Sequence, residues 1–268
     1  MTEISVIIPT YNREKKIEAA IRSVLGQKPG DYHISEVLII DDNSSDNTID
    51  VVSAINDERI RYHRNRENLG AGGARNRGVE LAVSDWIAFQ DSDDVWYEDK
   101  LLKQTEFLKK HDGCEMVTHA IKAVFADKEI TTLIEEEEDM FAKVCLRNFV
   151  DAPSILMKKK LFEELGGFDV RLKALEDWDL ALRYLDAHEI GIINEPLLEA
   201  DMIIGGVSSD AGNYYDARCM IIAKNLGILK KHNCFETAVK GLLDEAERNN
   251  VLQNVSRLLE YYIVGMNK

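Results

Sequence analysis

The sequence predicts an α/β protein with a mixed, mainly parallel sheet flanked by helices and a helical extension at the C-terminal end. Short apolar runs typical of buried strands alternate with segments of helical periodicity, which favours a parallel sheet with helices on both faces. Polar clusters directly follow three of these runs, at residues 9–12, 41–46 and 91–94. Ligands bind at the carboxyl ends of strands in open sheets, so these clusters mark the candidate site.

The N-terminal elements alternate between strand and helix. We expect strands at 4–8, 37–40 and 60–63, a helix over 17–25 that Asn12 caps, and a helix at 48–55. The glycine-rich run 68–78 then opens a helix, where small residues allow close backbone approach and the helix start favours an anion. Its spacing matches neither the dinucleotide fingerprint nor the P-loop, although Arg75 and Arg77 could meet a phosphate.

Three carboxylates fall within four residues after the apolar run 86–89. In an extended segment alternate side chains share a face, so Asp91 and Asp93 can point the same way. Two like charges this close repel unless a cation lies between them, and hard oxygen ligands suit Mg²⁺ or Mn²⁺. We therefore expect a divalent metal that holds a diphosphate. The alternative is an acidic turn in which Asp94 caps the next helix.

The elements after the acidic cluster follow in a mixed order of helices and strands. We expect a helix over 97–110, a strand at 116–121 and a solvated acidic segment at 127–139. A strand at 154–157 is followed by a helix that starts at residues 158–160 and by a turn at 166–169. A helix opened by residues 176–179, a strand at 190–194 and two or three amphipathic helices over 211–264 complete the order. Acidic residues at a helix start, as at 176–179, are ordinary partners of the helix dipole.

The chain of 268 residues carries a formal charge of −15, and 45% of its residues are hydrophobic. Its length allows one large domain or a domain with an appendage, and its charge argues against nucleic acid as the main partner. Four scattered cysteines without metal-type spacing are expected to be free thiols in a reducing cytoplasm. Without a signal pattern or a run of roughly 20 apolar residues, the protein is expected to be cytoplasmic or peripheral at the inner face of the cell membrane.

Five motifs resemble, in the same order, those of the family 2 glycosyltransferases, which adopt the GT-A fold. They are Ser5–Asn12, Ile40–Asp46, Ala74–Asn76 at the end of the glycine-rich run, Asp91–Asp94, and Gly166–Asp169 followed by Glu176–Asp177. Each motif is weak alone, whereas five in the family's order form a specific signal over residues 3–200. The resemblance implies an inverting transferase that uses a nucleotide-diphospho-sugar, most often a UDP-sugar, with Mn²⁺ or Mg²⁺.

The resemblance also implies roles for individual residues. The nucleotide-binding residues would be Pro9, Thr10 and Tyr11 in the base pocket, Asp42 at the uracil edge, Arg75, and Asp91 with Ser92. Asp93 would be the direct metal ligand, with Asp91 toward the ribose or a metal-bound water, and Asp41 would support a strand end. Asp177 matches the general base, which takes the proton of the attacking hydroxyl. Glu176 would position the acceptor or the base.

One segment departs from the family's pattern. Many relatives carry a Tyr-Arg pair and then a His, which help close the site over the diphosphate, where this chain has residues 200–207. We expect a GT-A domain at 1–205, with a nucleotide-binding half at 1–95 and an acceptor half at 96–205. Helices at 206–268 would complete it and are candidates for homodimer or membrane contact.

The predicted function is inverting transfer of a hexose or N-acetylhexosamine from a UDP-sugar to a hydroxyl of a glycan or lipid-linked glycan, in bacterial surface polysaccharide synthesis. Two alternatives belong to other classes. One is a non-catalytic nucleotide-sugar-binding or scaffold protein of the same fold. The other is a metal-dependent nucleotidyltransferase, which usually needs a glycine-rich loop with basic residues after the first strand, where this chain has residues 9–12.

Overall fold

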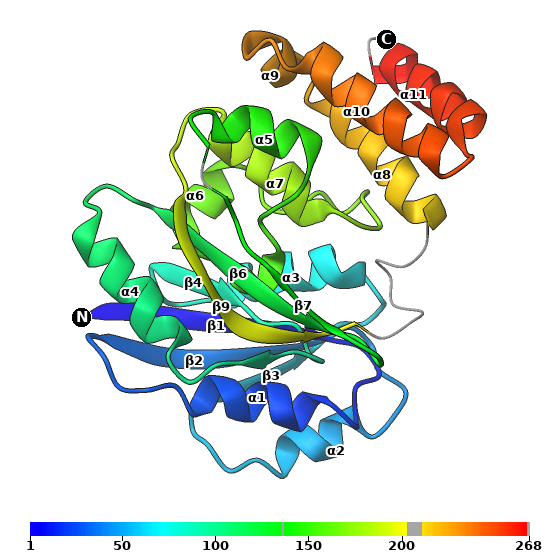
Figure 1. Cartoon of the computed structure of the whole chain (residues 1–268). Coiled ribbons are helices and arrows are strands. Elements are labelled where there is room, and N and C mark those ends of the chain that lie inside the picture. The colour runs from blue at the N-terminus through cyan, green and yellow to red at the C-terminus, as the bar shows by residue number, and fades with distance from the viewer. Residues whose placement is uncertain (136, 203–210, 267–268) are drawn as a thin grey trace. The chain divides into compact units, whose positions relative to one another are not determined.

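The computed structural model describes residues 1–135, 137–202 and 211–266 (Figure 1). The chain divides into two compact units that interleave along the sequence. The first consists of Met1–Glu135, Val150–Val170 and Glu189–Ile203, and the second of Glu136–Phe149, Arg171–His188 and Ile204–Lys268. The domain boundaries expected at residues 95 and 205 stay predictions.

The first unit is built on a sheet of nine strands within the described residues, in the order β3-β2-β1-β4-β8-β6-β9-β5, with β7 paired to β6. The strands are β1 (Thr2–Thr10), β2 (Tyr32–Asp41), β3 (Ile60–Arg64), β4 (Trp86–Phe89), β5 (Val95–Trp96), β6 (Met116–Val124), β7 (Glu129–Thr132), β8 (Leu156–Lys158) and β9 (Gly191–Asp201). The pairs β1–β2, β1–β4, β2–β3 and β6–β9 are parallel, and the short strands β5, β7 and β8 pair antiparallel. The predicted mixed, mainly parallel sheet is therefore confirmed.

Helices cover both faces of this sheet, as predicted (Figure 1). The helices of the first unit are α1 (Ile17–Leu25), α2 (Thr48–Ser53), α3 (Gly70–Leu81), α4 (Lys100–Lys110) and α6 (Lys159–Glu164), with a 3₁₀ turn, η1 (Ala152–Ser154). Along β1, Val6 and Ile8 pack in one core with Ile21 of α1. The intervening Ile7 points to the other face, where a Cβ at Gly78 of α3 would lie 2.4 Å from its Cγ2. Glycine thus lets the backbone of α3 lie directly on β1.

The second unit is helical. It contains α5 (Met140–Leu146), α7 (Glu176–Leu185), α8 (Ala211–Lys224), α9 (Leu226–Lys231), α10 (Phe235–Arg248) and α11 (Leu252–Met266). The indole Nε1 of Trp178 donates to the carbonyl oxygen of Val144 over 2.5 Å, which joins α7 to α5. The buried Asp179 accepts hydrogen bonds from Arg183 of α7 and from Lys224 of α8, so α7 is held by charge as well as by packing. The C-terminal segment was expected to hold two or three helices and has four among its described residues.

One local expectation is wrong and a second is incomplete. Asn12 does not cap α1, whose N-cap is Lys16. Asn12 has a φ of 53°, and its side chain accepts a hydrogen bond from the backbone N of Ser45 instead. The segment 127–139 is exposed as expected over most of its described residues, but it also contains β7, because an antiparallel partner on β6 supplies the backbone hydrogen bonds that its sequence alone does not indicate.

The described helices include none that is both long and apolar enough to cross a bilayer. All four cysteines are free thiols.

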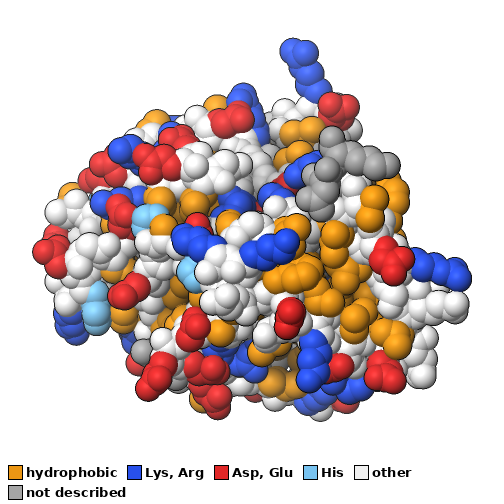
Figure 2. Space-filling model, turned by 90° about the horizontal axis from the view of Figure 1, so that it is seen from above, with side chains coloured by type: hydrophobic (Ala, Val, Ile, Leu, Met, Phe, Trp, Pro, Cys, Tyr) orange, Lys and Arg blue, Asp and Glu red, His pale blue; other side chains and the backbone are white. Residues whose placement is uncertain are grey.

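In α11, Tyr261 and Val264 are exposed, and Figure 2 shows hydrophobic side chains gathered in one region of the face seen from above. Homodimer or membrane contact by the C-terminal helices stays a prediction.

A lysine lies fully buried in the core of the first unit. Lys100, at the start of α4, donates to Oε1 of Gln104 over 2.8 Å, and its Nζ lies 4.1 Å from the centre of the Trp96 ring. Burial lowers the pKa of Lys100 well below its usual value. The buried His119 likewise has a lowered pKa, because of burial first and then the charge of Lys100.

The variant Lys100→Met should remove from the folding stability a contribution that rises with pH, so that its free energy of unfolding has a more negative slope against pH than that of wild type. The pKa of Lys100 is lowered in the folded chain and ordinary in the unfolded chain, so between these values only the unfolded chain holds the proton. The contribution of Lys100 to the free energy of unfolding therefore rises with pH, by up to about 1.4 kcal/mol per unit. Urea titrations from pH 7 to pH 8.5 measure this slope. Lys110→Met, at the exposed end of the same helix, is the control, and equal slopes in wild type and Lys100→Met would contradict the expectation.

Candidate active site

The three polar clusters lie at the carboxyl ends of neighbouring strands, as predicted. The strands β2, β1 and β4 are adjacent, and Thr10 at the end of β1 is in register with Asp41 at the end of β2. The backbone N of Asp42 donates to Thr10 over 2.8 Å, and that of Gln90 donates to Ile7 over 3.0 Å. The clusters 9–12, 41–46 and 91–94 are thus brought to one edge of the sheet.

The acidic cluster is a turn and not the extended segment that the sequence suggested. The backbone N of Asp94 donates to the carbonyl oxygen of Asp91 over 3.2 Å, which closes a four-residue turn between β4 and β5. Gln90 ties the turn by donating from Nε2 to the carbonyl oxygen of Asp94 over 2.7 Å. Ser92 is buried within the turn. Asp91 and Asp93 are nevertheless close enough for the charge of Asp91 to raise the pKa of Asp93.

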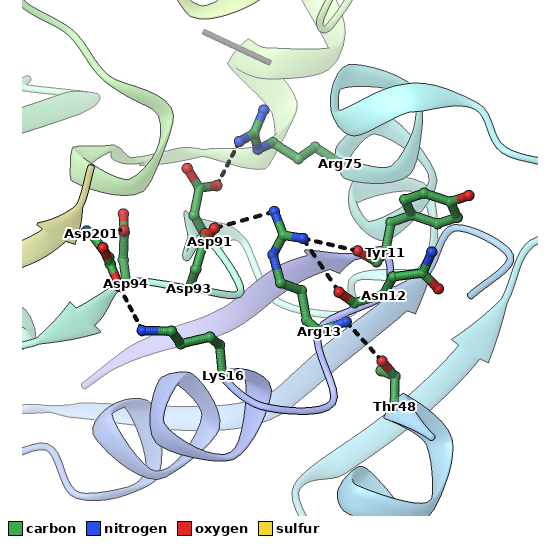
Figure 3. Close-up of polar contacts among 10 residues, drawn as sticks. All are labelled: Tyr11, Asn12, Arg13, Lys16, Thr48, Arg75, Asp91, Asp93, Asp94 and Asp201. Atoms are coloured by element: carbon green, nitrogen blue, oxygen red, sulfur yellow. Dashed lines mark hydrogen bonds and ion pairs between the residues drawn. The ribbon is translucent and has the colours of Figure 1, made fainter. Parts of the chain in front are cut away.

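Asp91 is paired with the predicted phosphate-binding arginine. Nη2 of Arg75, on α3, lies 2.6 Å from Oδ1 of Asp91 (Figure 3). The guanidinium of Arg75 is buried and lies 5.7 Å from the centre of the Phe168 ring. The side chain of Asn76 holds the backbone of Phe168 on both sides, accepting from its N over 2.9 Å and donating to its O over 2.8 Å. The glycine-rich helix α3 and the turn 166–169 thereby jointly fix the position of Arg75.

Asp93 is paired with a second arginine, which the sequence analysis missed. Nη2 of Arg13 lies 3.2 Å from Oδ2 of Asp93 (Figure 3). Burial and then the charge of Asp91 raise the pKa of Asp93, and Arg13 opposes both. The available signal was a cation directly after the 9–12 cluster at a strand end.

Asp94 has a structural role different from the expected helix cap. The N-cap of α4 is Asp99, and Oδ1 of Asp94 accepts a hydrogen bond from the backbone N of Asp201 over 3.1 Å. Asp201 in turn pairs with Lys16 over 2.6 Å. Burial, followed by the charges of Asp91 and Asp93, raises the pKa of Asp94 to about 9. A pKa raised this far favours the neutral form of Asp94 at neutral pH.

The predicted uracil partner, Asp42, is enclosed by backbone donors at the start of α3. Its carboxylate accepts hydrogen bonds from the backbone N of Leu69 over 2.9 Å, from that of Gly70 over 2.8 Å, and from Nδ2 of Asn65 over 2.8 Å. The anion at this helix start is thus Asp42 itself. Its contact with uracil stays a prediction. The neighbouring Asp41 accepts from the backbone N of Ser44 over 2.7 Å and supports the strand end.

The expected base-pocket residues lie at the end of β1 and just beyond it. Pro9 and Thr10 are buried, whereas Tyr11 is exposed. An exposed ring beside the other strand ends is free to stack on a base. The assignment of these three residues to the base pocket is a prediction.

Glu176 and Asp177 belong to the second unit, in the first turn of α7. Leu175 precedes them with a φ of 62°, the left-handed region. Oδ1 of Asp177 accepts hydrogen bonds from Nδ2 of Asn148 over 3.1 Å and from the backbone N of Trp178 over 2.7 Å. The carboxylate is half-buried and oriented. Asn148, which no sequence pattern marked, supplies one of these orienting hydrogen bonds.

The side chains that could ligate a metal can be compared with the coordination that a divalent cation needs. Within the described residues, no three His, Cys, Asp or Glu side chains are grouped so as to hold a metal by themselves. Mg²⁺ in phosphate-handling sites takes one or two carboxylates, and phosphates and water complete its shell. Asp91 and Asp93 are carboxylates of the number and type that fit an ion of this kind.

Comparison with known proteins decides the family. The chain matches the family model described as Glycosyl transferase family 2 over residues 5–166. The chain belongs to glycosyl transferase family 2. The match includes the strand-end clusters and Arg75, and it ends before Glu176 and Asp177.

Curated relatives of this family 2 chain are bacterial glycosyltransferases. It is 42% identical over 191 residues to "UDP-Glc:alpha-D-GlcNAc-diphosphoundecaprenol beta-1,3-glucosyltransferase WfgD" of Escherichia coli, covering 71% of this chain and 73% of that one. An uncharacterized glycosyltransferase of Haemophilus influenzae is 30% identical over 200 residues, covering 72% of this chain, and one of Rickettsia felis is 32% identical over 211 residues, covering 78%. The chain spans 66% and 34% of these two relatives' lengths.

Solved structures confirm the GT-A fold that the sequence predicts for this family 2 chain. The structure of S. aureus TarS 1–349 in complex with UDP-GlcNAc superposes with a TM-score of 0.69 at 19% identity, covering 99% of this chain and 92% of that one. The structure of mannosyltransferase PcManGT from Pyrobaculum calidifontis, in complex with GDP-Man and Mn²⁺, superposes with a TM-score of 0.63 at 17% identity, covering 98% of this chain and 85% of that one. At these identities the likeness concerns the fold alone.

The segment 200–207, where the chain departs from the family's basic pattern, is described only as far as Met202. Residues 203–207 lie outside the described residues. In sequence, the segment contains no Lys, Arg or His. The basic side chains near the acidic turn therefore come from other parts of the chain, namely Arg13 and Arg75.

Proposed function

We propose that the protein transfers a hexose or N-acetylhexosamine from a UDP-sugar to a hydroxyl of a glycan acceptor, with inversion at the anomeric carbon. The observation that carries this proposal is the acidic turn after β4 of a family 2 chain, in which Asp91 faces Arg75 of α3 and Asp93 faces Arg13, just beyond β1. Carboxylates that can share a cation, next to buried positive charge, suit the recognition of a nucleoside diphosphate.

The nucleotide would lie across the ends of β1 and β2. The exposed ring of Tyr11 offers a stacking surface for the base, with Pro9 and Thr10 as the floor of the pocket. Asp42 would meet the uracil edge if one of its backbone donors gave way. Arg75 would stay with Asp91 and contribute positive charge toward the phosphates.

Asp93, with Asp91, would hold a Mn²⁺ or Mg²⁺ ion that arrives with the diphosphate. The bound cation would act as a Lewis acid that offsets the charge on the departing nucleoside diphosphate. The buried Asp94, whose raised pKa favours its neutral form, keeps the turn in place through the hydrogen bond that it accepts from the backbone N of Asp201.

Asp177 would act as the general base. Its carboxylate is oriented by Asn148 and by the backbone of Trp178, and it would accept the proton of the acceptor hydroxyl as the oxygen attacks. Glu176, its neighbour in the first turn of α7, would position the acceptor hydroxyl or the base.

The acceptor we propose is a lipid-linked glycan, so that the enzyme works at the inner face of the cell membrane in surface polysaccharide synthesis. Support comes from WfgD, whose name gives a diphosphoundecaprenol-linked GlcNAc as its acceptor and UDP-Glc as its donor.

A thermal-shift panel of UDP, GDP, CDP and TDP, each with Mn²⁺ and with EDTA, tests the nucleotide and metal parts of the proposal. We expect UDP with Mn²⁺ to raise the Tm by about 5 °C or more at a hundredfold excess over its Kd. The other nucleotides, and UDP with EDTA, should stabilise the protein less.

Each other result of the panel contradicts a named part. Equal stabilisation by UDP in Mn²⁺ and EDTA removes the metal from the proposal. Stabilisation by another nucleotide changes the donor class, and no stabilisation at all favours the scaffold alternative. Release of pyrophosphate from UTP and a sugar phosphate would favour the nucleotidyltransferase.

A further inference from the structure

The two arginines at the acidic turn are held in different ways. Arg75 is buried, with 6% of its side chain exposed, and lies 2.6 Å from Asp91 beside the Phe168 ring. Arg13 has 39% of its side chain exposed and lies 3.2 Å from Asp93. The first pair is therefore built into the fold, and the second lies at the surface of the site, where solvent and ligands reach it.

The backbone of Arg13 is anchored independently of its side chain. Its N donates to Oγ1 of Thr48 over 2.9 Å, the N of Asn12 donates to Oγ of Ser44 over 2.9 Å, and the N of Glu14 donates to Oδ2 of Asp46 over 3.0 Å. The loop therefore keeps its place whichever way the guanidinium points. A long side chain on a fixed backbone can change partners by rotating its own torsions.

The contacts of the guanidinium are few and exchangeable. Nη1 of Arg13 donates to the carbonyl oxygens of Tyr11 and Asn12 over 3.2 and 3.3 Å, at the outer limit of hydrogen bonds, and Nη2 faces Asp93 (Figure 3). Asp93 is also the carboxylate proposed to bind the cation. Two positive groups cannot share one carboxylate without repelling each other, so the cation and the guanidinium compete for Asp93.

We propose that Arg13 is an exchangeable counter-ion of Asp93. In the ligand-free chain it neutralises this carboxylate, and when the donor and its cation occupy Asp93 the released guanidinium binds the diphosphate of the same donor. This inference rests on the proposed function. It assigns to Arg13 the positive charge that segment 200–207 does not supply, because that segment has no basic residue.

The test frees Arg13 without any metal. In Asp93→Asn the carboxylate loses its charge, so the guanidinium is released in the presence of EDTA. UDP affinity in EDTA, measured by calorimetry, is expected to rise about tenfold over wild type, the effect of one charged hydrogen bond. The gain should vanish in the double variant Arg13→Ala, Asp93→Asn.

A matched control breaks the neighbouring ion pair. Asp201→Asn releases Lys16, which lies 2.6 Å from Asp201, and changes the net charge by the same amount as Asp93→Asn. UDP affinity of Asp201→Asn in EDTA should equal that of wild type. Circular dichroism of each variant confirms that the fold is intact, and Arg13→Gln replaces Arg13→Ala if the latter is unstable.

The outcomes separate this inference from the proposed function. If the gain in UDP affinity persists in the double variant, or if Asp201→Asn reproduces it, the gain is a general effect of removing a negative charge. Either result overturns the role of Arg13. The role of Arg13 is also overturned if Asp93→Asn binds UDP in EDTA no more tightly than wild type does. This includes the case in which neither wild type nor Asp93→Asn binds UDP detectably in EDTA. Failure of wild type to bind UDP even with Mn²⁺ would instead overturn the proposed function.

Discussion

Asp177→Asn is expected to lower kcat by about 10²–10⁴-fold, the usual contribution of a general base. The amide has the same shape as the carboxylate, and its oxygen can still accept the hydrogen bonds that Asn148 and the backbone of Trp178 donate. It cannot take a proton from the acceptor hydroxyl. Release of UDP in the presence of an acceptor measures turnover, and calorimetry with UDP should give the wild-type affinity.

Asp186→Asn is the control for this prediction. It makes the same chemical change directly after the last residue of α7, at a carboxylate that pairs with Lys231 over 2.7 Å. Its turnover should match that of wild type. Normal turnover by Asp177→Asn would remove Asp177 from the base role, and a joint loss of turnover and UDP affinity would mean that the substitution disturbs the fold of the site.

The sheet and the position of the candidate site could be predicted because their signals are local. The apolar runs that become β1, β2 and β4 are each followed at once by polar residues, and parallel strands bring such ends to one edge. The strands β5, β7 and β8 gave weak signals, because they have only two to four residues each. Their pairing depends on partners distant in sequence, which periodicity does not encode.

The individual roles of the acidic side chains depended on such distant partners. Asp94 follows a strand and precedes a helix, which favours a cap, but its partner is Asp201, 107 residues away. Asp42 looked free to meet a base, and its carboxylate is enclosed by the backbone of residues 69 and 70. Arg13 directly follows a strand-end cluster in the sequence, but its pairing with Asp93 depends on the turn that brings this carboxylate to it. Sequence pattern thus placed these groups at the site without showing which pairs form.

Asp93→Ala is expected to make UDP affinity independent of Mn²⁺ and to lower kcat by about 10²–10³-fold, a typical loss when one group that stabilises the leaving charge is removed. Asp93 is the carboxylate with the exposed, exchangeable partner, whereas Asp91 is held by the buried Arg75. A cation arriving with the diphosphate would therefore lose its main protein ligand. Calorimetry with UDP in Mn²⁺ and in EDTA measures the first effect, and initial rates measure the second.

The comparison between the two conditions serves as the internal control for Asp93→Ala. A misfolded turn would weaken UDP binding in Mn²⁺ and in EDTA alike, whereas loss of a metal ligand removes only the gain that Mn²⁺ gives to wild type. If the variant kept the full Mn²⁺ effect, the cation would be held elsewhere. The turn 91–94 would then be a structural acidic turn, whose charges Arg13 and Arg75 compensate, and the assignment of Asp93 as metal ligand would be wrong.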